Sequence, residues 1–294
     1  MRIGIVGAEN THCAAVAKTL NIEKKCGSAR VLAVWGETTA LAHKAANEGN
    51  ISKIARRPED MLGLIDGVMI DHRHPKYHAK AARIFMEHGI PCFVDKPFTY
   101  TSAEGVRLLR DARKKGVPIT SFSVIPEQEG FKKDFLKKIK KAGKILLISS
   151  SGPCDFKSRW GGIFFYGIHQ VDAVLKAFGG GIKSVRVIKA PRGNASCVIV
   201  MKYANPGPLV SLSCVTGGAT GFCFNAMGTK ATVIYENRFD PNPYLSGIKK
   251  FIKMFRTGKE PFTYGEIMEP ICVLEAIDRS WRTGKEARVK EPNI

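Results

Sequence analysis

The chain has no apolar run that approaches the roughly 20 residues needed to span a bilayer. Basic residues are also scarce at its start, where a single one, Arg2, precedes the apolar stretch Ile3–Gly7. Such an opening is typical of the first strand of a fold and not of a signal peptide. We therefore expect a globular, cytoplasmic protein that does not bind membranes.

Closely spaced cysteine pairs are missing too. None of the eight cysteines forms a Cys-x-x-Cys motif, and most stand inside apolar runs, where cysteine acts as a small hydrophobic residue. A long chain without a secretory segment rarely depends on disulfides. The sequence therefore predicts no disulfide framework.

Acidic residues are few, because 26 Asp and Glu stand against 46 Lys and Arg, for a formal net charge of +20. Much of this excess lies in Arg110–Gly116 and Phe131–Lys144. In the second segment apolar residues share one helical face and lysines fill the other, which favours a solvated face over a nucleic-acid patch. No zinc finger, RNA-binding motif or helix-turn-helix pattern accompanies it. We expect no nucleic-acid partner, although this charge attracts anionic small molecules such as a dinucleotide.

The first half of the chain alternates strands and helices with short connections. This alternation predicts an α/β fold whose N-terminal part is a Rossmann-type, doubly wound parallel sheet with right-handed crossovers. The expected strands are Arg2–Ala8, Arg30–Gly36, Ile51–Ile54, Gly67–Asp71, Ile90–Val94 and Val117–Val124. The expected helices are Thr11–Leu20, Thr39–Asn47, Pro58–Leu64, Lys76–His88 and Ser102–Lys115.

After Val124 strand-like runs follow one another closely, separated by Gly, Pro and Asn turn signals. They predict an α+β domain with an open, mostly antiparallel sheet and helices on one face, expected at Gly130–Ala142, Ile168–Phe178 and Gly265–Arg282. The other face is left to pack against a second copy, so we expect a homo-oligomer, a dimer or a tetramer. The predicted domains are residues 1–123 for a dinucleotide and residues 124–294 for substrate binding and oligomerisation.

The turn after the first strand lacks two of the three glycines of the dinucleotide fingerprint G-x-G-x-x-G. Gly7 holds the first position, and Glu9 and His12 hold the other two. Glu9 would bring a carboxylate close to the bound diphosphate, at a helix N-terminus that favours anions. The turn by itself therefore favours a dinucleotide site only weakly.

The second strand should end in an acid that holds the adenine ribose. Gly36 occupies that position and Glu37 follows it. Glu37 within reach of both ribose hydroxyls would favour NAD. Alternatively, Gly36 leaves room for a 2′-phosphate near His43 or Lys44, so NADP is not excluded.

Two further segments carry candidate chemistry. Asp95-Lys96-Pro97 ends a short apolar strand, and the carboxyl ends of such strands face the crevice where open α/β sheets bind ligands. Taken alone, Lys96 is better explained as a strand-end lysine that reaches solvent. His169 and Asp172 lie three apart on one helical face after a glycine-lined loop. Either His169 is a core residue with its hydrogen bonds satisfied, or the carboxylate orients a proton-accepting imidazole at a site.

These pieces together resemble the Gfo/Idh/MocA oxidoreductases, the family of glucose-fructose oxidoreductase and inositol dehydrogenase. The resemblance spans nearly the whole chain. Asp95-Lys96-Pro97 stands for the family's Glu-Lys-Pro, and a Gly-Gly segment at Gly161 leads to the Gly-x-His-x-x-Asp motif that ends at Asp172. Phe251–Val289 is similar to the family's closing helix and tail.

The resemblance implies hydride transfer between a nicotinamide cofactor and a sugar, inositol or related polyol. Lys96 would contact the reacting hydroxyl and the nicotinamide ribose, His169 would take the hydroxyl proton, and Asp172 would bind substrate or position the histidine. These three side chains are expected to converge on one cavity. The remaining predicted contacts are Gly7, Ala8, Glu9, Asn10, Glu37, Asp71, His72, His74, Asp95 and Lys96 for the cofactor, and Arg159, Trp160 and Tyr166 for the substrate.

Departures from the family pattern leave a second hypothesis open. Glu9 and His12 weaken the glycine-rich turn, and Phe165 stands where the family commonly has an acid. A non-catalytic ligand-binding or regulatory protein on the same scaffold would tolerate these changes. Histidines in Asp71–Ala79 could suggest a metal, but no carboxylate or cysteine set completes them, so we expect no metal site.

Overall fold

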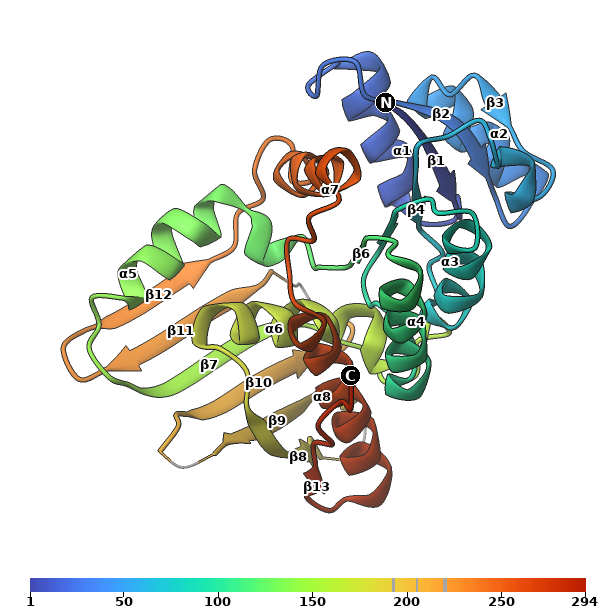
Figure 1. Ribbon diagram of the computed structural model, residues 1–294. Helices are drawn as coiled ribbons and strands as arrows, with labels where there is room; N and C mark the ends of the chain where they lie inside the picture. Colours follow the sequence, from blue (N-terminus) through green and yellow to red (C-terminus); the bar gives the residue numbers. More distant parts are fainter. Residues whose placement is uncertain (192–193, 205, 219–220) are drawn as a thin grey trace. The chain divides into compact units, whose positions relative to one another are not determined.

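The computed structural model describes residues 1–191, 194–204, 206–218 and 221–294. The chain folds into two compact units (Figure 1), each built on one β-sheet. The first unit holds Met1–Phe122, Tyr244–Ile267 and Ile294, and the second holds Ser123–Pro243 and Met268–Asn293. Within the described residues, no helix combines the length and apolar character that a membrane span requires.

The first unit contains a six-stranded sheet in which every pair of neighbours is parallel, in the order β3-β2-β1-β4-β5-β6. Because β1 lies in the middle, the strand order reverses beside it, and ligands of doubly wound sheets bind at such a reversal. This sheet confirms the predicted Rossmann-type fold. Its strands are β1 (Arg2–Val6), β2 (Arg30–Trp35), β3 (Lys53–Ile54), β4 (Gly67–Ile70), β5 (Cys92–Val94) and β6 (Ile119–Thr120).

Helices cover both faces of this sheet. The α-helices are α1 (Thr11–Ala17), α2 (Thr39–Gly49), α3 (His78–Met86), α4 (Ser102–Lys115) and α7 (Leu245–Thr257). Short turns of other helix types are η1 (Lys18–Ile22), η2 (Pro58–Met61) and η3 (Pro75–Tyr77). On β5, Phe93 joins the core formed with α1, α2 and α7, whereas the thiol of Cys92 lies near Ala82 of α3. Since successive strand residues point to opposite faces, α3 lies on the side away from α7.

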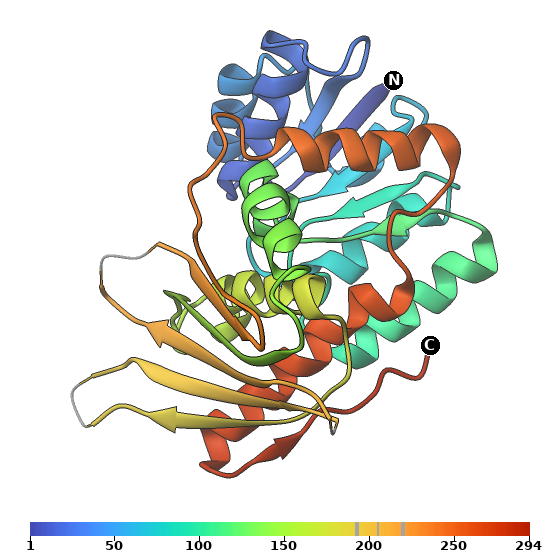
Figure 2. The same ribbon diagram turned by 90° about the vertical axis from the view of Figure 1, so that its left-hand side faces the viewer.

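Helix α7 belongs to the first unit although it follows the whole second sheet in sequence. Figure 2 shows α7, in orange, lying along the first sheet. Its Ile248, Phe251 and Ile252 join the core of β1 and β2, and the ring of Phe251 stacks on that of Phe93 with centroids 4.7 Å apart. The predicted boundary placed all of residues 124–294 in one domain. In the structure, Tyr244–Ile267 packs with the first unit. These apolar side chains of α7 complete the core of the first sheet, so the segment is part of the first unit.

The second unit contains a mixed, mostly antiparallel sheet in the order β12-β11-β7-β10-β9-β8-β13, with one parallel pair, β7 and β10. It confirms the predicted open sheet. Its strands are β7 (Ile145–Pro153), β8 (Ile182–Lys189), β9 (Cys197–Tyr203), β10 (Leu209–Val215), β11 (Cys223–Gly228), β12 (Thr232–Glu236) and β13 (Ala287–Arg288). Its helical segments are η4 (Ile125–Glu127), η5 (Phe131–Leu136), α5 (Lys137–Ile139), α6 (Ile163–Phe178) and most of α8 (Tyr264–Thr283).

Three predicted helices differ in form. Thr11–Leu20 changes to a π-helix at Lys18, and the lysine-rich helix is a π-helix, η5, followed by one short α-helical turn. Helix α6 starts at Ile163, five residues earlier than expected, so Gly167 lies inside the helix and not in the loop before it. A Cβ on Gly167 would come within 2.5 Å of Ile163 and 3.5 Å of Leu274, so this glycine serves close helix packing.

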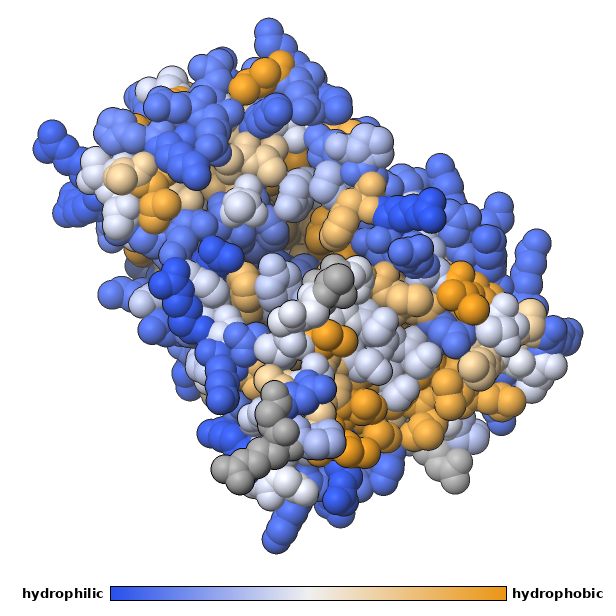
Figure 3. Space-filling view, turned by 180° about the vertical axis from the view of Figure 1, so that it is seen from behind, coloured by the Kyte–Doolittle hydropathy of each residue, from blue (hydrophilic) through white to orange (hydrophobic). Residues whose placement is uncertain are grey.

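One face of the second sheet carries apolar side chains that α6 and α8 do not cover. Strand register puts Leu209 opposite Leu147, and Leu147 opposite Met227, on that face. Figure 3 shows an orange, apolar area over these strands. Its exposed members are Ile188, Val198, Leu209, Met227 and Ile234.

Candidate active site

The turn after β1 approaches the chain after β4 so closely that only glycine fits. Gly7 has φ +111°, and a Cβ there would lie 2.5 Å from the backbone nitrogen of His72. The next two backbone N–H groups, of Ala8 and Glu9, both donate to one oxygen of Glu37, at 2.9 and 3.0 Å. Two converging N–H groups at the start of α1 form an anion site, because backbone donors and the helix dipole both favour negative charge.

This turn can hold a dinucleotide diphosphate, since the carboxylate of Glu37 stands in for a phosphate oxygen on the same donors. A bound diphosphate would have to displace Glu37, which follows β2, the strand expected to hold the ribose. The second oxygen of Glu37 is buried and has no hydrogen-bond partner within the described residues. The expected conflict between Glu9 and the diphosphate is thus accompanied by a second one, from Glu37, that the sequence did not reveal.

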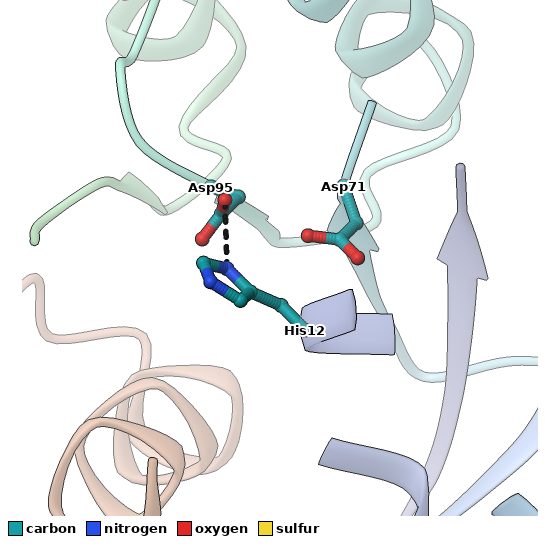
Figure 4. Close-up of side chains that lie close together, drawn as sticks. All are labelled: His12, Asp71 and Asp95. Carbon is teal, nitrogen blue, oxygen red and sulfur yellow. Dashed lines mark hydrogen bonds and ion pairs between the residues drawn. The ribbon is translucent and has the colours of Figure 1, made fainter. Parts of the chain in front are cut away.

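A buried polar cluster lies where β4, β5 and α1 meet (Figure 4). The side chain of Asn10 donates to Asp71 and to Asp95, at 3.1 Å each. The Nδ1 atom of His12 lies 3.0 Å from the same Asp95 oxygen, Oδ2. Asn10 stands at the N-cap of α1 but makes no side-chain cap bond, and its amide nitrogen donates to these two aspartates. Lys96 follows directly and is only 7% exposed, so it is a buried lysine and not one that reaches solvent.

The charges in this cluster depend on one another. Burial, with the nearby charges of Asp95 and Glu37, holds the pKa of Asp71 well above its usual range. Burial acts on Asp95 in the same direction, but the pairing with His12 and the charge of Lys96 outweigh it and lower that pKa. Burial lowers the pKa of Lys96, and both aspartates oppose it. The pKa values of the two aspartates thus shift in opposite directions, because like charges raise a carboxyl pKa and opposite charges lower it.

One set of three potential metal ligands occurs among the described residues. It consists of His12, Asp71 and Asp95, whose ligand atoms all lie within 4.8 Å of one another. One imidazole with two carboxylates is a donor set that suits a divalent ion. Asn10 and the charge of Lys96 already balance these carboxylates, so the expectation of no metal site is kept as a prediction.

The loop after β4 is fixed by histidines. His78 is buried, and its ring nitrogens lie 2.9 Å from the carbonyl oxygen of Pro97 and 2.8 Å from that of His72. The ring of His78 therefore contacts both the loop after β4 and the chain after Lys96. The ring of His72 packs near those of Trp35 and Tyr77, and the backbone N–H of Lys76 donates to Nδ1 of His74.

Acid should destabilise the first unit through His72. Burial lowers the pKa of His72 from 6.5 to about 3, so the unfolded chain binds a proton below about pH 6.5 that the folded chain refuses. Stability therefore falls as the pH falls, by about 2 kcal/mol between about pH 7 and pH 5. His78 and His74, whose pKa values burial also lowers, add to this loss. Urea unfolding at both pH values measures it.

The matched variant is His72→Gln, which keeps a polar side chain but does not titrate. It should lose about 2 kcal/mol less than the unmodified protein over the same pH interval. An equal loss in both proteins would contradict the assignment to His72.

In the second unit, one serine links the two residues of the His-x-x-Asp motif. The hydroxyl of Ser123 lies 2.7 Å from Nδ1 of His169, and its backbone N–H donates to Oδ2 of Asp172 at 2.9 Å. Both motif residues are buried on α6, at 5% and 4% exposure. Asp172 thus fixes Ser123, and Ser123 in turn holds the imidazole. Ser123 therefore joins the two motif residues, and the role expected of Asp172 stays a prediction.

The predicted substrate contacts lie before and within the first turns of α6. Arg159 places its guanidinium 4.3 Å from the ring centre of Trp160, a cation–π arrangement. Tyr166 is 39% exposed, and its ring centre lies 6.1 Å from that of His169. Tyr166 and His169 are therefore neighbours, whereas Arg159 and Trp160 contact each other.

The structure brings the predicted residues together in two groups. Asn10, Asp71 and Asp95 form the first with Lys96 beside them, and His169, Asp172 and Tyr166 form the second. Sequence reasoning missed His12, noted only as a missing glycine, and Ser123, which stands at the end of the apolar run Val117–Val124. Both are polar residues that follow the end of a strand or its turn, and this position was the one feature of the sequence that could have marked them as site residues. The convergence of Lys96 with His169 stays a prediction.

Comparison with known proteins identifies the class. Residues 1–122 match the GFO_IDH_MocA family model, described as an oxidoreductase family with an NAD-binding Rossmann fold. The first 122 residues are therefore similar to this oxidoreductase family, which agrees with the resemblance to the Gfo/Idh/MocA oxidoreductases that the sequence indicated. A search of curated proteins found no match.

Solved structures share the fold over the whole chain. A probable dehydrogenase from Thermotoga maritima is 16% identical with a TM-score of 0.86, covering 99% of this chain and 100% of its own. A putative myo-inositol dehydrogenase from Sinorhizobium meliloti is 17% identical with a TM-score of 0.84 and the same coverage. The myo-inositol dehydrogenase of Lactobacillus casei, solved with NAD(H) and myo-inositol, is 14% identical with a TM-score of 0.84, covering 99% and 97%. At these identities the likeness establishes the fold.

Proposed function

We propose that this protein is an NAD(P)-dependent dehydrogenase that oxidises a CH–OH group of a sugar, inositol or related polyol, with NAD as the preferred cofactor. The observation that carries the proposal is Lys96, a buried lysine at the carboxyl end of β5 beside Asp95, in a domain of an NAD-binding family. Inositol enters as a substrate class through the named structural relatives. Bound NAD would supply the hydride acceptor.

Lys96 stabilises the developing charge in this proposal. As the hydroxyl loses its proton, negative charge gathers on the oxygen, and a fixed ammonium beside it lowers the barrier. Burial strengthens that effect because a low-dielectric site screens charge poorly. Asp95 keeps the lysine protonated, and His12 and Asn10 hold Asp95 in turn.

His169 is the proposed base. Its Nδ1 atom is held by the hydroxyl of Ser123, so Nε2 accepts the proton of the substrate hydroxyl. Loss of this proton and of the carbon-bound hydride converts the CH–OH group to a carbonyl. Asp172 acts through Ser123 as a positioning residue, and Tyr166, Arg159 and Trp160 remain the proposed substrate contacts.

On the cofactor side, Gly7, Ala8 and Glu9 would present the diphosphate site. Glu37 would leave the two N–H groups and hold the adenine ribose. Asn10, Asp71, His72, His74 and Asp95 complete the proposed wall near the nicotinamide.

A thermal-shift panel of NAD, NADH, NADP and NADPH tests the proposal, followed by turnover assays with myo-inositol and scyllo-inositol. A ligand that binds only the folded state stabilises it by about 2.7 kcal/mol at a hundredfold excess over Kd. For a chain of this size that corresponds to a rise of a few degrees in Tm. The absence of a shift with all four dinucleotides would contradict the proposal.

The second candidate is a non-catalytic ligand-binding protein with weakened cofactor binding. It is favoured by the bonds from Ala8 and Glu9 to Glu37, which a dinucleotide has to break. Binding of sugars or inositols with no dinucleotide shift and no turnover would support it.

We also propose that the uncovered face of the second sheet joins two copies of the chain into a dimer or a larger homo-oligomer. Ile234 and Ile188 are 69% and 53% exposed there, and burying such side chains is favourable. Sedimentation of Ile234→Lys should shift toward the monomer, and unchanged assembly would contradict this interface.

A further inference from the structure

A cleft of about 1080 Å³ lies at the opposite edge of the first sheet from Gly7 and Lys96. Met1, which precedes β1, and Asp66, which precedes β4, contribute to its lining. Because parallel strands all begin at one edge of their sheet, this cleft belongs to the amino-terminal edge, whereas the cofactor turn belongs to the carboxyl edge. Residues of helix α7 also line it.

The lining of this cleft has a large excess of positive charge. Lys249, Lys253 and Arg256 follow one another at spacings of four and three along α7, so they share one helix face, and all three are exposed. Among the described residues that line the cleft, Asp66 is the one acid. Like charges at this spacing repel, which destabilises a helix. A bound anion would relieve that repulsion.

The acids near the cleft do not offset this charge. Asp66, which lines the cleft, accepts from the guanidinium and the backbone N–H of Arg2, at 2.6 and 2.8 Å. Lys25, from the loop after η1, is paired with Glu23 at 3.0 Å, at an exposed position. The acid that lines the cleft is therefore already engaged by Arg2.

The floor of the cleft is apolar and firmly packed. Ile252 is 3% exposed, and the ring of Phe255 lies over Gly67, where a Cβ would come within 2.4 Å of it. The thiol of Cys26 also lines the cleft. Burial raises its pKa, and the charges of Lys249 and Arg256 oppose that rise, which agrees with both cations lying near the thiol.

We propose that this cleft binds a small molecule that carries two or more phosphate groups. Ammonium groups and a guanidinium bind phosphate oxygens through charge-assisted hydrogen bonds, and a row of three suits several linked phosphates better than one carboxylate. The rigid apolar floor offers contact to a carbon skeleton between the phosphates. This site is independent of the proposed dehydrogenase activity, because it shares no residue with the cofactor turn.

Titration calorimetry with inorganic tripolyphosphate tests the proposal on the full chain. We expect one ion per chain, with binding weakened by added salt because the site is open to solvent. The double variant Lys249→Ala/Lys253→Ala should bind at least about tenfold more weakly. Both lysines are exposed, so Tm should change little.

The matched control is Lys137→Ala/Lys140→Ala, which removes the same charge from exposed lysines of the second unit. It should keep tripolyphosphate affinity within about twofold, and saturating NAD should leave that affinity unchanged. Equal losses in both double variants would mean that the net charge alone attracts the ion. Competition with NAD, or the absence of binding, would equally overturn the proposal.

Discussion

Replacing Lys96 with methionine should reduce kcat at least about a thousandfold, at the upper end of what one lost transition-state donor costs. Methionine keeps the length and apolar stem of the lysine but removes its charge. Lys96 is buried beside Asp95 and Asp71, so no solvent cation replaces the lost ammonium next to the reacting oxygen. The rate of nicotinamide reduction, with whichever polyol gives turnover, measures the effect.

The control separates chemistry from folding. Removing one partner of a buried charged group can cost about 3–5 kcal/mol of stability, so the variant must be shown to fold by its unfolding curve. NAD affinity from thermal shift should stay within a few fold, because the proposed diphosphate donors are the N–H groups of Ala8 and Glu9. A folded variant that binds NAD and keeps a tenth of the activity would refute the role given to Lys96.

Replacing His169 with asparagine should lower kcat by about 10²–10⁴, the usual contribution of a general base. Asparagine can still bond to the hydroxyl of Ser123, so the local geometry is largely kept while the proton acceptor is lost. The acid limb of the pH–rate profile should disappear, since that limb reports protonation of the base.

Ser123→Ala provides the comparison for His169. It leaves the imidazole in place but removes the hydroxyl that holds Nδ1, and we expect a loss of about tenfold, smaller than that of removing the base. The acid limb should remain and move along the pH axis. An unchanged pH profile in His169→Asn would show that another group takes the proton.

The two strand-end motifs could be predicted because their signals are local. A run with no polar face must be buried on both sides, so the sequence alone put Asp95 and Lys96 at the carboxyl end of a parallel strand. Likewise, a three-residue spacing on a helix put His169 and Asp172 on one face. The neighbours of these residues are not local. His12 reaches Asp95 across 83 positions, and no periodic pattern records such a pairing.

The packing of α7 in the first unit is a second contact between distant residues that local patterns do not predict. Its apolar stripe predicts that Ile248 and Phe251 are buried, but the stripe does not say against which sheet. Only the packed structure gives it the rings of Phe93 and Phe122 as partners. A boundary drawn from composition therefore followed the change in strand pattern and separated α7 from its core.

The sequence by itself determined the order of strands and helices, the family resemblance and the strand end that carries Lys96, because hydrophobic period and turn residues act over a few positions. Only the tertiary structure decided that Glu37 occupies the N–H groups of the cofactor turn, that Ser123 links His169 to Asp172, and that α7 gathers its cations at the far edge of the first sheet. These contacts join residues distant in the chain, and their free energies depend on burial and geometry that exist only after folding.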